Sequence, residues 1–392
     1  MRPAERTRQL GVEGAFDVLS RARALEAQGR HIIHLEIGEP DFPTPAHIVE
    51  AAKTALDAGY THYGPTMGLP DLREAIAADV AATRHIQVDA SQVCVTPGAK
   101  PALFYAMLAT LEKGDEVLLP DPGFPIYASL ARYLEALPVA VPLVESRQFS
   151  FDLDFLADHL TPRTKMVILN SPHNPTGGVM PAADVRALAN LLMDRDIVVV
   201  SDEIYRTIHF GEEPPMSISS IPGMAGKTII IDGFSKSHAM TGWRLGYGIY
   251  PSWLVDTVSK LVVNSNSCTA SFVQKAGLAA IAGPQDERLR MVEEFRVRRD
   301  DFVRQLAGIP GFSCTVPLGA FYAYPSIEGS GRDSKELEVA LLNQAGVACL
   351  AGTAFGSMGS HHLRFSMANS LQNLQLAAQR IIDWINLVPV LI

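Results

Sequence analysis

One lysine of the sequence, Lys236, lies in a setting that suits covalent chemistry. The segment TIIIDGFSKSHAMTGWRLGYGIY, residues 228–250, places it in a turn rich in serine and glycine between two apolar, strand-like runs. Burial lowers the pKa of a lysine, and the neutral amine can form a Schiff base with an aldehyde. Arg244 follows in the same segment, and a guanidinium suits bidentate binding of a phosphate. Taken alone, Lys236 fits a solvated surface lysine better, so its neighbours in the sequence decide the interpretation.

Those neighbours favour an aldehyde that carries a phosphate, and pyridoxal 5'-phosphate is the cofactor with both groups. The chain reads NSPHNPTGG from Asn170 and VVVSDEIY from Val198, so Asn174, Asp202 and Tyr205 each follow an apolar run. With these motifs in this order, the sequence resembles the class I/II aminotransferases, which are fold type I pyridoxal-phosphate enzymes of the aspartate aminotransferase superfamily. The resemblance extends from GEPDF at Gly38 to HHLRFS, which contains Arg364.

The elements that must position these residues are seven short apolar segments. They run from Val93 to Thr96, Glu116 to Pro120, Leu137 to Val141, Met166 to Asn170, Ile197 to Asp202, Thr228 to Asp232 and Leu245 to Tyr250. Helical-period stretches such as 101–111 and 182–193 separate most of them, which predicts an α/β fold with a mostly parallel sheet covered by helices on both faces. Ligands bind beyond the carboxyl ends of such strands, where Gly98, Asn174, Asp202 and Lys236 are expected.

The alternation of apolar strands and helices ends at Pro284. A long charged helix is predicted over 286–306, followed by a strand-like GAFYAYP from Gly319 and a last helix over 371–387. The resemblance implies a seven-stranded large domain at 48–290 that binds the cofactor, and a smaller α+β domain. Residues 1–47 supply an N-terminal arm and part of this small domain, and 291–392 supply the rest. The apolar C-terminal end NLVPVLI is expected to pack on the body of the protein.

The phosphate site is expected where the strand VCVT turns through Gly98, Ala99 and Lys100 into a helix. Free backbone N–H groups and the positive helix end attract an anion there, at about 0.3–1 kcal/mol. Charge-assisted hydrogen bonds from Arg244 are worth roughly 1.5–3 kcal/mol each, so Arg244 should dominate. Relatives often carry a phosphate-binding serine where this chain has Gly233. Ser235 or a bound water is the expected substitute.

The resemblance assigns the remaining roles around the cofactor ring. Asp202 pairs with the pyridine nitrogen and keeps it protonated. Asn174 and Tyr205 hydrogen-bond the ring 3'-oxygen, and Phe124 of DPGFPIY stacks on the ring. Lys236, Asp202 and Tyr205 form the expected catalytic set. The alternative for Asp202 is a carboxylate that caps a helix or lies in a loop. For Asn174 it is a role in a turn, and for Tyr205 and Phe124 it is packing in the core.

The substrate and a second subunit complete the predicted site. Arg364 matches the arginine that binds the substrate α-carboxylate, for which a guanidinium fork is the best handle, and Asn174 and Gly38 lie at the same end. Tyr63 matches a tyrosine that reaches the phosphate in the neighbouring subunit. The resemblance therefore implies a homodimer with shared active sites.

Charge, cysteine spacing and the lack of long apolar runs limit the expected partners, metal sites and location of the protein. The formal charge is −9 and no basic patch occurs, which disfavours nucleic acid. The four cysteines, at 94, 268, 314 and 349, show no metal-ligand spacing, so we expect no metal site. We expect these cysteines to be free thiols in a reducing compartment. We see no signal peptide and no apolar run long enough for a bilayer, so the cytoplasm is the expected location and no membrane the expected partner.

The predicted reaction is transfer of an amino group from an α-amino acid to a 2-oxo acid by a ping-pong mechanism. A β-lyase acting on cysteine conjugates, or another enzyme on the same scaffold, uses the same residues and is the alternative. A transcriptional regulator would need a DNA-binding region before residue 30, where there is no room. The sequence leaves the substrate side chain open, since solvated or capping roles are expected for Lys100, His173 and His62.

Overall fold

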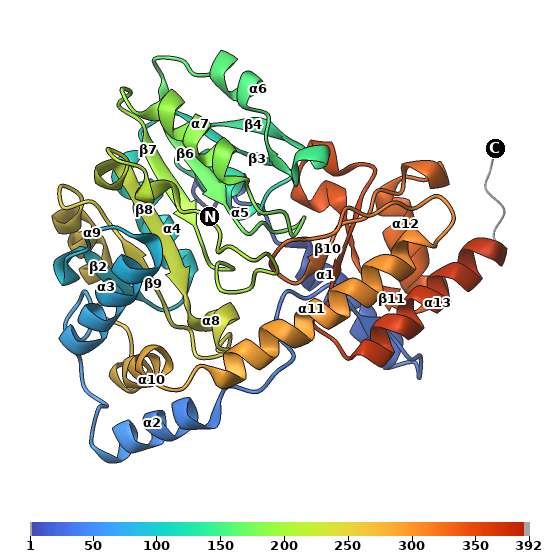
Figure 1. Ribbon diagram of the computed structural model, residues 1–392, viewed down its shortest axis with the longest axis horizontal. Coiled ribbons are helices and arrows are strands. Elements are labelled where there is room, and N and C mark those ends of the chain that lie inside the picture. The colour runs from blue at the N-terminus through green and yellow to red at the C-terminus, as the bar shows by residue number, and fades with distance from the viewer. Residues whose placement is uncertain (1, 388–392) are drawn as a thin grey trace.

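The computed structural model describes residues 2–387, and a large mixed sheet forms its centre (Figure 1). The strands of this sheet are β2 Val93–Thr96, β3 Glu116–Asp121, β4 Leu137–Val144, β5 Ser150–Phe151, β6 Thr164–Asn170, β7 Val198–Asp202, β8 Thr228–Gly233 and β9 Gly246–Ile249. They lie in the order β2-β9-β8-β7-β6-β3-β4-β5. The pairings from β8 through β4 are parallel, whereas β9 and β5 run antiparallel to their neighbours.

All seven strands predicted from the sequence are present, which confirms the α/β fold with a mostly parallel sheet. The number of strands was wrong, because the sheet has eight. The additional strand, β5, has two residues and pairs only with the end of β4. A strand of two residues has no periodicity that a sequence could show.

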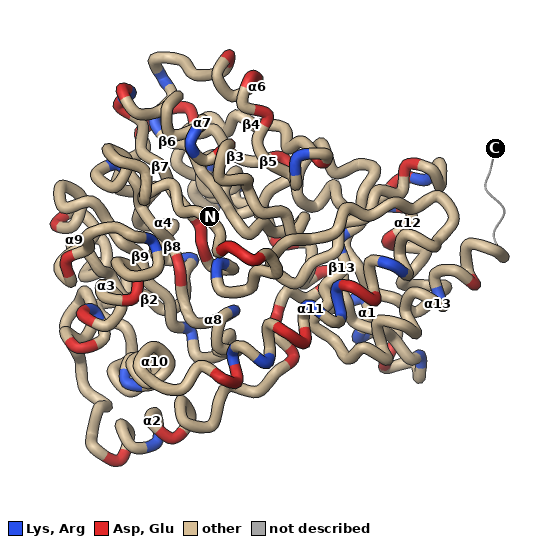
Figure 2. The backbone as a smooth tube through the Cα atoms, in the orientation of Figure 1, with Lys and Arg blue, Asp and Glu red and all other residues tan. Residues whose placement is uncertain are grey.

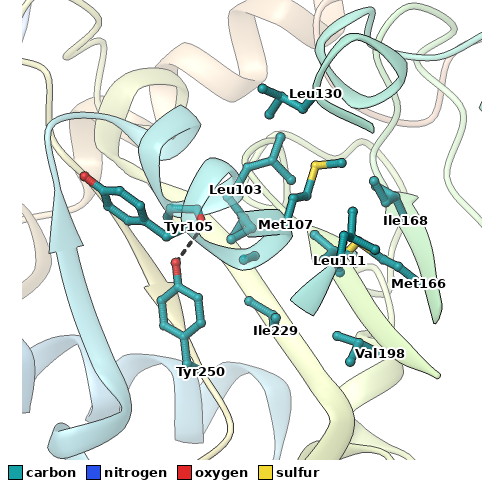
Figure 3. Close-up of a cluster of buried hydrophobic side chains, with 14 of the residues drawn as sticks. Leu103, Tyr105, Met107, Leu111, Leu130, Met166, Ile168, Val198, Ile229 and Tyr250 are labelled. Carbon is teal, nitrogen blue, oxygen red and sulfur yellow. Dashed lines mark hydrogen bonds between the residues drawn. The ribbon is translucent and has the colours of Figure 1, made fainter. Parts of the chain in front are cut away.

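Helices cover both faces of the sheet, because successive strand residues point to opposite sides. In β6, Met166 and Ile168 pack in one core and Val167 and Leu169 in the other. The first core lies beneath α4 Ala99–Thr110, α5 Ile126–Tyr133 and α9 Val255–Val263, and Figure 3 shows its side chains between α4 and the strands. The opposite face is covered by α2 Ala46–Asp57, α3 Pro70–Arg84, α6 Leu153–Asp158, α7 Ala182–Leu192 and α10 Ser271–Ala282.

A second group of elements joins the two ends of the chain. Its strands are β10 Tyr322–Ala323, β12 Leu350–Ala351 and β13 Leu363–Ser366, with the parallel pair β1 Ile33–His34 and β11 Val347–Ala348. Its helices are α1 Gly14–Glu26, α12 Ser334–Ala340 and α13 Leu371–Leu387. Figure 1 shows α1, in blue, among these orange and red elements. The division at residues 47 and 290 stays a prediction.

The long helix α11 Asp286–Ala307 runs from the sheet to this second group (Figure 1). It begins where the sequence predicts and carries ion pairs one turn apart, such as that between Arg296 and Glu293. Acidic and basic positions are interspersed along the backbone as a whole (Figure 2). Within residues 2–387, no helix is long and apolar enough to cross a membrane. The expected packing of the C-terminal end falls mostly outside the described residues.

Candidate active site

A cavity of about 450 Å³ opens at the carboxyl ends of β6, β7 and β8, and its size suits a small-molecule ligand. The site residues predicted from the sequence line it with two exceptions, Gly98 and Tyr63. The lining residues among them are Gly38, Ala99, Lys100, Phe124, Asn174, Asp202, Tyr205, Ser235, Lys236, Arg244 and Arg364. These residues come from segments spread over more than 300 positions of the chain, so only the tertiary structure brings them together.

Lys236 occupies the short helix α8 Phe234–Ser237, directly after β8. Its Nζ donates a hydrogen bond of 2.5 Å to the carbonyl oxygen of Gly38. Burial lowers the pKa of Lys236 to about 8, and although Glu39 opposes this shift, the positive charges of Lys100, Arg364 and Arg244 reinforce it. A substantial share of this amine is therefore neutral at mildly alkaline pH, as a nucleophile or base requires.

Asp202 is the last residue of β7 and is buried at the base of the cavity. It accepts a hydrogen bond of 2.7 Å from the hydroxyl of Tyr127 and one of 3.3 Å from the backbone N–H of Ile204. Burial raises the pKa of Asp202 to about 6, and both hydrogen bonds oppose that shift. A cationic partner inside the cavity would restore its negative charge.

Arg364 lies in β13, fully enclosed at the far end of the cavity. Its Nη1 is 3.3 Å from the side-chain oxygen of Asn174, its Nη2 donates to the carbonyl oxygen of Glu36, and its Nε has no hydrogen-bond partner. Among the described residues, no carboxylate forms a salt bridge with it, and burial lowers its pKa. A buried guanidinium with an unused donor is prepared for an external carboxylate.

Two aromatic rings hold this guanidinium in place. The Arg364 guanidinium carbon lies 4.6 Å from the ring centre of Tyr322 and 5.0 Å from that of Phe355. The hydroxyl of Tyr322 is 2.8 Å from that of Tyr205. The position of Tyr322 also explains why residue 38 is a glycine, because a Cβ at that position would lie 2.1 Å from the Tyr322 hydroxyl oxygen.

Two closely packed glycines, Gly98 and Gly246, lie next to Arg244 behind the cavity lining, and we call this region the glycine cradle. Gly98 has a φ of 91° and precedes α4, whose first turn has no side-chain cap. A Cβ on Gly98 would lie 2.3 Å from Nη2 of Arg244, and one on Gly246 would lie 2.5 Å from the backbone nitrogen of Ala99. The two glycines thus allow Arg244 and β9 to approach the first turn of α4 closely, which brings the guanidinium beside a helix N-terminus, a type of position that attracts anions.

Gly233 belongs to the same close-packed region. A Cβ there would lie 2.9 Å from the Cα of Gly246 and 3.1 Å from the carbonyl oxygen of Leu245. The close approach of β8 to β9 therefore disfavours a serine at this position. Ser235 lines the cavity, in keeping with the contact expected of it.

Comparison with known proteins agrees with this geometry. Residues 30–381 match the family model described as aminotransferase class I and II. The chain is 40% identical to the aspartate aminotransferase of Pyrococcus abyssi over 90% of this chain and 91% of that protein. It is 38% identical to aromatic-amino-acid aminotransferase 2 of Thermococcus litoralis, over 90% and 92%. The crystal structure of the aspartate aminotransferase from Rhizobium meliloti superposes with a TM-score of 0.94 at 34% identity, covering 98% of each chain.

The chain belongs to the class I and II aminotransferases. It is an enzyme that moves an amino group from an α-amino acid to a 2-oxo acid by a ping-pong mechanism, on a type I fold. The relatives described above are named as aminotransferases, which favours transfer over the elimination reaction considered from the sequence.

Among the residues of this aminotransferase's cavity that sequence reasoning missed are two tyrosines, Tyr127 and Tyr322. Tyr127 lies one helical turn after Phe124, and the two rings contact edge to face at 5.7 Å. This i, i+3 spacing was a usable signal. Tyr322 lies in the GAFYAYP segment that was assigned only as a strand, and nothing local distinguishes it from the core residue Tyr324.

Three further side chains can now be placed. Lys100 points into the cavity, where it forms an ion pair with Glu13 and lies 5.4 Å from the ring centre of Phe124. The Lys100 side chain is 46% exposed, so the solvated role expected for it remains compatible with its place at the cavity. His173 and His62 do not line this cavity. Tyr63 is 91% exposed and lies outside it on its own chain.

Proposed function

We propose that the aminotransferase binds pyridoxal 5'-phosphate in this cavity, with Lys236 as its covalent attachment point. A phosphate fits the glycine cradle, where the first N–H groups of α4 and the guanidinium of Arg244 supply donors. A protonated pyridine nitrogen fits Asp202, whose pKa is raised by burial and further by the negative charges of Asp232 and Glu203. Asn174, Tyr205 and Phe124 line the same cavity. Asn174 and Tyr205 would hydrogen-bond the ring oxygen, and Phe124 would stack on the ring face.

The chain's own residues then perform the proton and binding steps. Arg364 orients the substrate through its α-carboxylate, and Gly38 allows close approach because it has no side chain. The cofactor, when bound, supplies the electron sink for the substrate α-carbon. The Nζ atom of Lys236 accepts the proton from that carbon, for which a pKa near 8 is well matched. Asp202 holds the positive charge on the ring nitrogen.

One observation carries this proposal: the amine of Lys236, which has a lowered pKa, and the guanidinium of Arg364, which has no carboxylate partner among the described residues, line the same cavity. Its test is borohydride reduction of the purified enzyme, followed by mass analysis of its peptides. We expect a phosphopyridoxyl group on Lys236 and none on Lys100. An active enzyme without this adduct would refute the attachment point.

For the substrate we infer a dicarboxylic amino acid such as aspartate. Four cationic side chains line the cavity: Lys100, Lys236, Arg244 and Arg364. Three have the roles given above, and Lys100 remains for a side-chain carboxylate. Within the chain, Lys100 forms an ion pair with Glu13. A substrate carboxylate would replace Glu13 as the partner of Lys100. Aspartate is also the substrate in the names of two of the relatives described above.

We further infer a homodimer in which Tyr63 completes the site of the second subunit. A tyrosine that is 91% exposed is unusual for a large aromatic side chain, and Val263 is 53% exposed as well. Hybrid dimers test this. A Tyr63→Ala protomer combined with a Lys236→Ala protomer should regain activity, because one of the two sites then has both residues intact. Failure of an isolated hybrid to exceed the parent variants would exclude shared sites.

A further inference from the structure

Behind the cavity, on the reverse side of β7 and β8, lies a buried ion cluster centred on Arg84, the last residue of α3. Nε of Arg84 donates to Glu203 at 3.0 Å, and Nη2 donates to Asp232. All three residues are less than 10% exposed. The ordinary cost of burying a guanidinium is outweighed by Asp232 and Glu203, which raise the pKa of Arg84. The guanidinium of Arg84 is therefore charged, and it binds one carboxylate directly after β7 and one within β8.

The two carboxylates occupy equivalent positions at the strand ends. The backbone ladder between β7 and β8 ends at the pair Asp202 and Ile231, with a last hydrogen bond of 2.8 Å from the N–H of Glu203 to the carbonyl of Ile231. In this register, Glu203 and Asp232 would form the next pair. Arg84 joins their side chains at the point where backbone pairing stops.

Both carboxylates are tied to residues of the cavity. Glu203 directly follows Asp202 in the chain. Asp232 accepts a hydrogen bond of 2.7 Å from the N–H of Gly233, the residue at which β8 turns into the helix of Lys236. A shift of either carboxylate is thereby transmitted over a few covalent bonds to Asp202 or Lys236.

Other donors fix the same carboxylates. Ser201 and Ser217 donate to Oε1 of Glu203 at 2.9 and 2.5 Å, and the hydroxyl of Tyr247 donates to Asp232 at 3.2 Å. Buried ion pairs of this kind contribute little net stability compared with apolar packing, and their best-attested use is to fix register. An ion cluster directly behind the strand ends that carry Asp202 and Lys236 is well placed to fix their register.

We propose that Arg84 is a positioning residue that fixes the placement of Lys236 relative to Asp202 by clamping Glu203 to Asp232. The inference rests on the proposed roles of Lys236 and Asp202. Neither Arg84 nor its two carboxylate partners line the cavity, so the clamp acts through the strand ends and not by contact with substrate.

The test compares Arg84→Met and Arg84→Lys with a matched control, Arg299→Met. Arg299 is also buried, but it binds Asp300 and the carbonyl of Pro317 on α11 and the loop beyond it. In Arg84→Met we expect kcat to fall on the order of ten- to a hundredfold, because displacements near 1 Å have effects of that size. KM should stay within about twofold, since Arg364 is untouched. Arg84→Lys, which keeps the charge without the fork, should fall in between.

A readout without cofactor accompanies the kinetics. In crystal structures of the cofactor-free Arg84→Met variant, the separation between the Asp202 carboxylate and Lys236 Nζ should differ from wild type, whereas Arg299→Met should preserve it. If Arg84→Met does not fold, Arg84→Lys and Tyr247→Phe carry the same comparison. Wild-type kcat and geometry in the folded Arg84 variants, with only a lower melting temperature, would overturn the inference. Failure of the proposed function itself would instead be seen in wild type, as a missing adduct on Lys236.

Discussion

The hydroxyl of Tyr127, on α5, donates a 2.7 Å hydrogen bond to the carboxylate of Asp202, at the end of β7. Both groups are buried. Burial raises the pKa of Tyr127 well above its ordinary value, so the phenol stays a neutral donor over the working pH range. Burial also raises the pKa of Asp202, and the bond from Tyr127 opposes that rise. The hydrogen bond from Tyr127 therefore favours a negative charge on Asp202 where this carboxylate faces the cavity.

Removing that donor should impair the enzyme at neutral pH. A hydrogen bond to a charged group contributes about 1.5–3 kcal/mol, so Tyr127→Phe should lower kcat/KM roughly ten- to a hundredfold. The pKa of Asp202 should rise further, which moves the acid limb of the pH–rate profile to higher pH. Tyr250→Phe is the control, since it removes a buried hydroxyl bonded to the Ala102 carbonyl in the core of Figure 3. Equal profiles for the two variants would contradict the role given to Tyr127.

The lowered pKa of Lys236 predicts a pH-dependent stability in the cofactor-free enzyme. The pKa is about 8 in the folded chain and 10.5 in the unfolded chain. Between these values the unfolded chain binds more protons, so stability rises with pH across this window. Relative to Lys236→Met, the wild-type free energy of unfolding should increase by up to about 3 kcal/mol from pH 7.5 to 10.5. Urea denaturation at several pH values measures it, and a constant difference would show that the amine is not perturbed.

Arg364 should affect activity and stability in opposite directions. Arg364→Met loses the charge-assisted hydrogen bonds to the substrate, so kcat/KM should drop by roughly 10²–10³. Because its guanidinium is buried without a carboxylate partner, the cofactor-free variant should unfold at the same or a higher denaturant concentration. Arg364→Lys should recover only part of the activity, since an ammonium cannot form the bidentate fork. A loss of stability that parallels the loss of activity would contradict this account.

The glycine cradle can be tested with two glycines that have nearly equal φ angles. Gly98 and Gly114 have φ angles of 91° and 90°, but a Cβ on Gly98 meets Arg244 whereas one on Gly114 meets nothing within 4 Å. Both alanine variants should lose roughly 1–3 kcal/mol of stability, because a residue with a Cβ is strained at a positive φ. Only Gly98→Ala should also displace Arg244 and weaken the affinity for pyridoxal phosphate, measured by absorbance titration. Equal affinity in both variants would exclude a phosphate site at this turn.

The inferred role of Lys100 predicts a change in substrate preference. Lys100→Met should lower kcat/KM for aspartate by about ten- to a hundredfold, the value of one charge-assisted hydrogen bond. Alanine, which has no side-chain carboxylate, should be affected less than about threefold. Lys165→Met, whose amine pairs with Asp196 away from the cavity, serves as control. A parallel loss for both substrates would assign Lys100 to the cofactor instead.

The sequence by itself determined the strands of the large sheet, apart from β5, and the polar residues that follow them. Lys236, Asp202 and Asn174 could be expected at one edge because the carboxyl ends of parallel strands meet there. Local periodicity and the strand-end rule require no knowledge of distant partners.

Only the tertiary structure decided which residues share a contact across the chain. Arg364 lies between Tyr322 and Phe355 and touches Asn174, 190 positions away. Tyr127 meets Asp202, 75 positions away, and Arg84 meets Asp232, 148 positions away. The physical reason is that burial, and with it pKa and the pairing of charges, depends on the final packing of separate elements. A residue's own type and local spacing do not specify its partners.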